Sequence, residues 1–91
     1  MTDTELLNKV KTGLGIFANY QDETLQIYID ETREFMKAAG VSAAVIASPV
    51  SVGCILRGVA DLWNYGSGSV GFSEYFKQRV NQLASEVSAD A

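Results

Sequence analysis

Apolar side chains recur at helical spacing in four long segments of the chain. The strongest pattern covers residues 22–39, where apolar positions follow the i, i+3, i+4 rule and charged residues fill the opposite side. Residues 3–13, 49–64 and 73–88 carry similar stripes. Because no alternating run is long enough to require a strand, the pattern predicts an all-α protein.

Residues that typically begin helices precede these segments. Thr2 and Glu5 have the spacing of a capping box, and Pro49 suits the first position of a helix. Asp22 and Ser73 can cap the helices predicted at 22–39 and 73–88. Ser42 can cap a short helical turn within 41–48. The starts therefore agree with the apolar stripes.

Glycines mark the predicted helix ends. Gly13 and Gly15 end the first helix, and Gly40 ends the second. Gly53 and Gly58 instead fall inside the third long helix, where glycine often marks a close approach between helices. We expect a compact bundle of four main helices plus a short turn, in one domain over residues 1–91, with a frayed tail at about 86–91.

Composition restricts the chemistry available to this chain. It has 91 residues, no histidine, one cysteine, a net charge of −4 and a pI of about 4.5. A histidine base, a Cys/His metal site and an intramolecular disulfide are therefore excluded, and a coat for nucleic acid is disfavoured. The polar start MTDTELLNKV is no signal peptide, and residues 41–56 are too broken by serine and proline to cross a membrane, so a soluble cytoplasmic protein is expected.

The remaining reactive groups have structural interpretations. Asp30, Glu31 and Glu34 share a helix face with basic residues, which favours a solvated surface over an acid–base or Mg²⁺ site. Cys54 has no histidine partner and is interpreted as a small buried apolar residue. Arg57 and Asp61, four residues apart, predict a modest surface salt bridge or contacts to a neighbouring subunit.

Aromatic residues surround a run of glycine and serine near the C-terminal third of the chain. GSGSVG at 66–71 lacks the lysine of a phosphate-binding loop, and no strand precedes it. We interpret it as a flexible connection between the last two long helices, whose ends are held by aromatic side chains. Base stacking is disfavoured because basic residues do not surround the aromatics.

The stretch RGVADLWNYGSGSVGFSEYFKQRVNQLA, residues 57–84, closely resembles the C-terminal half of tailed-phage head–tail connector proteins, also called head-completion or adaptor proteins. LLNKVKTGLGI and YQDETLQIYIDETREFMKAAGV resemble the first half, so the resemblance extends over about residues 5–85, and residues 57–79 are its most specific part.

The resemblance implies a virion structural protein and no catalysis or cofactor. Such proteins form a homo-oligomeric ring beneath the portal protein, complete the DNA-filled head and provide the docking surface for the next connector or tail-completion protein. DNA passes through the ring without sequence-specific binding. The expected location is the head–tail joint of a virion assembled in the host bacterial cytoplasm, without a membrane.

Two groups of residues are candidates for contacts in such an assembly. The aromatic residues expected to organise the junction of the last two helices are Trp63, Tyr65, Tyr75 and Phe76. The basic residues expected to contact another subunit or the portal are Arg57, Lys77 and Arg79. Val45 and Ile46 lie in an unusually apolar stretch, which either contacts a partner or closes the bundle.

Two other classes of function stay open at this point. One is a small helical DNA-binding protein for packaging or regulation, with the turn at 40–48 preceding a recognition helix at 49–64. That helix carries only Arg57 and Asp61 as charged residues, which is a poor set for reading a groove. An enzyme is the other class, and carboxylates or tyrosines alone would have to carry its chemistry.

Overall fold

A computed structural model describes residues 1–65 and 71–90, with residues 86–90 described by their backbone alone. The described chain is helical and contains no strand, which confirms the all-α prediction. The elements in chain order are α1 (Asp3–Leu14), α2 (Asp22–Ala38), α3 (Ala43–Ile46), the 3₁₀ helix η1 (Pro49–Ser51), α4 (Val52–Tyr65) and α5 (Glu74–Asp90).

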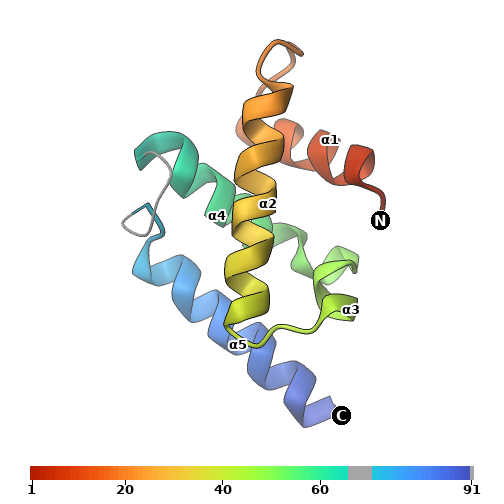
Figure 1. Cartoon of the computed structure of the whole chain (residues 1–91), viewed down its shortest axis with the longest axis vertical. Helices are drawn as coiled ribbons and strands as arrows, with labels where there is room; N and C mark the ends of the chain where they lie inside the picture. Colours follow the sequence, from red (N-terminus) through yellow and green to blue (C-terminus); the bar gives the residue numbers. More distant parts are fainter. Residues whose placement is uncertain (66–70, 91) are drawn as a thin grey trace.

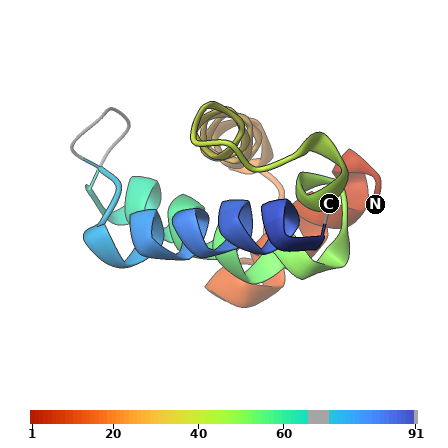
Figure 2. The same ribbon diagram turned by 90° about the horizontal axis from the view of Figure 1, so that it is seen from below.

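Helix α4 is the centre of the bundle, because it packs against α1, α2 and α5. Figure 1 shows α2 crossing α4, with α1 and α3 on the same side of α2. In Figure 2, α2 lies above the layer that α4 and α5 form, and the C-terminal end of α1 lies below this layer. The α4–α5 layer is thus covered by a whole helix on one side and only partly covered on the other.

The core is made from the apolar stripes that the sequence predicts. Its buried side chains come from all the long helices, from the segment between α2 and α3, and from the residues just before α5 (Leu6, Val10, Leu25, Ile29, Met36, Val41, Cys54, Ile55, Val59, Leu62, Phe72, Phe76, Val80 and Leu83). Burial of these side chains from water is the main term that stabilises the bundle.

Most predicted helix starts are confirmed. Thr2 and Glu5 form the capping box, with Thr2 Oγ1 accepting from Glu5 N at 3.1 Å and Glu5 Oε1 accepting from Thr2 N at 3.1 Å. Ser42 caps α3, and Pro49 begins η1, the 3₁₀ turn that leads directly into α4. Ser73 Oγ accepts from Phe76 N at 3.2 Å at the start of α5.

Asp22 does not cap α2, contrary to the prediction. Gln21 is at the cap position and makes no side-chain cap bond, so Asp22 is the first helical residue. The Asp22 carboxylate instead lies 2.8 Å from the ammonium of Lys11 on α1, and that ammonium also donates to Asn19 at 2.8 Å. This buried lysine joins the end of α1 to the start of α2.

The glycines have three different roles. Gly15 and Gly40 end α1 and α2 with φ of 72° and 101°, which confirms both stops, whereas Gly13 lies inside α1. A Cβ on Gly58 would come within 2.6 Å of Thr32 and 2.7 Å of Phe76, so this glycine marks a close approach as predicted. Gly53 faces open space and does not.

The C-terminal part of the chain departs from the expected boundaries. Helix α5 reaches Asp90, past the predicted end at residue 88. Fraying over 86–91 stays a prediction, because no side chain is described there. The predicted flexible connection at 66–71 falls almost wholly on residues 66–70, which lie outside the described part of the chain.

Candidate interaction site

The junction between α4 and α5 is held by a buried carboxylate. Asp61 is 2% exposed, and its Oδ2 accepts from the backbone N of Ser73 at 3.0 Å and from Ser73 Oγ at 2.7 Å. Its Oδ1 lies 3.5 Å from Nε of Arg57. The predicted ion pair of Arg57 with Asp61 is therefore present, but Asp61 is buried instead of exposed, because it faces the first turn of α5.

Three phenylalanines pack behind this junction. Phe72 stacks on Phe76 with ring centroids 4.7 Å apart, and Phe35 of α2 lies 4.9 Å from Phe72 and 5.6 Å from Phe76. Phe76 is fully buried in the chain's own core, so this contact candidate is not available to another subunit.

The other aromatic candidates do not hold the junction together. Trp63 is half-buried and meets Tyr28 of α2 edge to face, with centroids 6.4 Å apart. Tyr65 and Tyr75 are 72% and 61% exposed, so they do not pack in the chain's own core, and their contact with a neighbouring subunit stays a prediction. Phe72 and Phe35, absent from the candidate set, pack with Phe76 at the junction.

An open hollow of about 500 Å³ lies between α4 and α5. Its lining contains the candidates Arg57, Tyr75 and Arg79 (with Gly53, Gln78 and Gln82). A neighbouring hollow of about 410 Å³ shares Gly53, Arg57 and Tyr75 and adds apolar side chains from α1 and α4, Leu14, Leu56 and Ala60. Together they form one surface, which we call the α4–α5 hollow.

The polar end of the α4–α5 hollow is positively charged. The guanidinium of Arg57 lies over the Tyr75 ring at 5.4 Å from its centroid, a cation–π contact. Arg79 donates to Gln82 Oε1 at 2.8 Å, and no described carboxylate pairs with it. Lys77 is not at this surface and pairs with Glu74 at 3.6 Å. The hollow thus combines two guanidinium groups with an apolar floor.

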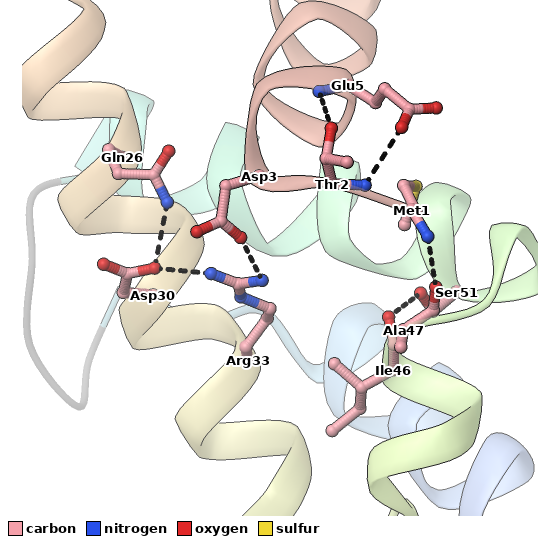
Figure 3. Close-up of polar contacts among 10 residues, drawn as sticks. All are labelled: Met1, Thr2, Asp3, Glu5, Gln26, Asp30, Arg33, Ile46, Ala47 and Ser51. Carbon is pink, nitrogen blue, oxygen red and sulfur yellow. Dashed lines mark hydrogen bonds and ion pairs between the residues drawn. The ribbon is translucent and has the colours of Figure 1, made fainter.

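A second region of about 510 Å³ lies between the N-terminus, α2 and α3. Arg33 joins Asp3 at 3.1 Å and Asp30 at 2.7 Å there, and the Met1 amine donates to Ala47 O at 3.5 Å (Figure 3). Partial burial acts to lower the pKa of Arg33, but the bonds to Asp30 and Asp3 raise it overall. Arg33, Asp3 and Asp30 are therefore paired with one another, whereas no described cation pairs with Glu34 in the same region.

Ile46 borders this second region, and Val45 and Ile46 both pack on the core while half-buried. Ser51 Oγ donates to Ile46 O at 2.8 Å, which fixes α3 against η1 (Figure 3). This packing agrees with the interpretation that the apolar stretch closes the bundle. Val50, one turn further on, is 60% exposed.

The remaining reactive groups form no site in the described part of the chain. No group of three or more metal-ligating side chains is found among those residues. Cys54 is buried, and burial raises the pKa of its thiol to about 11. A protonated, covered thiol is a poor nucleophile.

Several exposed apolar side chains were not among the residues that the sequence predicts to form contacts. Phe17 and Tyr20, in the connection from α1 to α2, are 86% and 83% exposed, and Ile27 on α2 is 62% exposed. Ile27 breaks the charged face of α2, and this interruption of the polar pattern is the signal that identifies it.

No family model matches this chain, and no curated protein and no solved structure is significantly similar to it. Within the described residues, no helix has both the length and the apolar character needed to cross a bilayer.

Proposed function

We propose that this protein is a structural subunit of a phage head–tail joint. Copies of the chain form a ring beneath the portal protein, complete the filled head and offer a surface to the next connector or tail component. Its role is mechanical and needs no catalysis, cofactor or metal. The proposal rests on the resemblance to connector proteins that the sequence analysis expects for residues 57–84.

The surface of the bundle supports an assembly role. A subunit of a ring needs two different contact surfaces, one for each neighbour. The α4–α5 hollow carries the positive side chains Arg57 and Arg79, and exposed apolar side chains lie on other elements, with Phe17, Tyr20 and Ile27 the clearest. A chain of 91 residues has a small core, so burial of these side chains between copies would also stabilise it.

The alternative, a small DNA-binding protein, has less support. Its recognition helix would be α4, but α4 packs against α1, α2 and α5, and Asp61 on it is buried. A recognition helix must present several side chains to a groove. Salt-dependent binding of the chain to duplex DNA at micromolar concentration would favour this alternative.

Co-purification with the portal protein tests the proposal. The genome that encodes this chain should also encode a portal protein, and the two should be expressed together with an affinity tag on the portal only. We expect the chain to be retained with the portal in several copies, measured by native mass spectrometry. Absence of a portal gene, or a portal that purifies without the chain, would contradict the proposal.

A further inference from the structure

The outer face of α2 carries an acidic stripe with an apolar centre. The stripe consists of residues spaced three or four apart along the helix, so they share one face: Glu23, Ile27, Asp30 and Glu34. The buried positions of α2, such as Leu25, Ile29 and Met36, lie on the opposite face. Lys37 follows the stripe in the last turn of α2, and Asp30 is already paired with Arg33.

Glu23 and Glu34 are exposed, and no described cation pairs with either carboxylate. Ile27 lies between them and is 62% exposed. An exposed apolar side chain flanked by carboxylates is complementary to a surface that offers an apolar contact with positive charge beside it.

The α4–α5 hollow offers this combination. Leu14, Leu56 and Ala60 form its apolar part, and Arg57 and Arg79 lie at its polar end. Ile27 matches the apolar part in character, and the two glutamates are opposite in charge to the guanidinium groups. Arg57 already pairs with buried Asp61, so Arg79 is the guanidinium that no described carboxylate pairs with.

The hollow and the acidic stripe lie on opposite sides of the molecule. On α4, Gly58 faces Thr32 of α2, whereas Gly53, Leu56 and Ala60 are on the other face of the helix. The stripe in turn points away from α4, because the buried face of α2 points toward it. In Figure 2, α2 lies above the layer that α4 and α5 form.

We infer that the acidic stripe of one copy binds in the α4–α5 hollow of the next. The contact joins two different surfaces, so a pair of copies keeps one free hollow and one free stripe, and repetition gives a ring when the rotation closes. The inference rests on the proposed function for its ring, and it adds the surfaces that form the subunit contact.

Two charge-reversed variants test the contact. Gln78→Glu with Arg79→Glu makes the hollow negative and leaves Arg57 beside buried Asp61. Glu23→Lys with Glu34→Lys makes the stripe positive. All four positions are at least partly exposed, and circular dichroism with thermal unfolding checks that each variant stays folded.

We expect the native chain to self-associate in sedimentation velocity at concentrations up to about 1 mM, where weak contacts with Kd in this range are populated. Each variant alone should weaken association at least tenfold, because like charges then meet. A mixture of the two should restore it, because opposite charges meet again at every contact. Ile27→Ser should weaken association without changing the helix content.

Three outcomes would overturn the inference: a native chain that stays monomeric, folded variants that associate like the native chain, or a mixture that stays dissociated. Duplex DNA that binds a monomeric native chain and loses affinity in the Arg79 variant would assign the hollow to phosphate instead. Retention on the portal is measured separately. If the chain is retained on the portal but the variants do not behave as expected, only the inference is rejected. If the chain is not retained on the portal, the proposed function is rejected.

Discussion

Asp61 on α4 accepts two hydrogen bonds from Ser73, twelve residues further along the chain, at 3.0 Å and 2.7 Å. The same serine caps α5 through Phe76 N. One buried carboxylate therefore fixes where the last helix starts relative to α4, and it holds the α5 side of the hollow, with Tyr75 and Arg79, opposite Arg57.

Removal of this carboxylate should destabilise the fold strongly. Asp61→Ala leaves the Ser73 N–H without its acceptor and Arg57 without its partner, and we expect a loss of about 3 kcal/mol in the free energy of unfolding by urea. Asp30→Ala is the matched control: this exposed carboxylate pairs with Arg33 at the surface, and its loss should cost about 1 kcal/mol or less. Equal losses in the two variants would contradict the role assigned to Asp61.

Two glycines of the same helix should respond in opposite directions to alanine. Gly58→Ala places a Cβ within 2.6 Å of Thr32 and should destabilise the chain by about 1–3 kcal/mol. Gly53→Ala meets no atom within 4 Å and should stabilise α4 by about 0.5–1 kcal/mol. Thermal and urea unfolding of both variants measures this, and a stabilising Gly58→Ala would contradict the close contact of α2 with α4.

The capping box of α1 should make stability depend on acidity. Hydrogen bonds from the backbone and side chain of Thr2 lower the pKa of Glu5 below 4.5 in the folded state. The contribution of Glu5 is therefore complete above about pH 4.5 and is lost as the pH falls through the lower folded value. Glu5→Gln removes this titration, so between about pH 7 and pH 3 it should lose less stability than the native chain. Equal losses in urea unfolding would show that Glu5 is not held by Thr2.

The lone cysteine should react slowly in the folded protein. Burial raises the pKa of the Cys54 thiol to about 11 from an ordinary value of 9.0. At about pH 8 the thiolate is then roughly 100-fold scarcer than in the unfolded chain, and the reaction with a disulfide reagent should slow by at least this factor. Rates within about tenfold of each other with and without denaturant would contradict the burial of Cys54.

The helices could be predicted from the sequence because local signals determine them. The stripes, the capping box at Thr2 and the glycines at 15 and 40 act within a few residues of chain. The candidate site was predicted only in part, because exposure depends on contacts between distant residues. Arg57, Tyr75 and Arg79 do meet at one hollow, whereas Phe76 belongs to the core.

The burial of Asp61 shows why spacing alone was misleading. Asp61 lies four residues after Arg57, which is the spacing of a pair at the surface of a helix. The hydrogen bonds that bury its carboxylate come from Ser73, twelve residues further along the chain. Asp61 lies seven residues after buried Cys54 and three after buried Gly58, so it is on the apolar face of α4. This spacing is the feature of the sequence that indicates its burial. Ile27 is the opposite case, an apolar residue on a polar face.

Electron microscopy of the chain purified with its portal tests the central claim most directly. The account predicts several copies arranged around the portal axis as a ring, each placing the outer face of α2 against the α4–α5 hollow of its neighbour. A portal without a ring of this chain, or single copies bound away from the axis, would contradict the account.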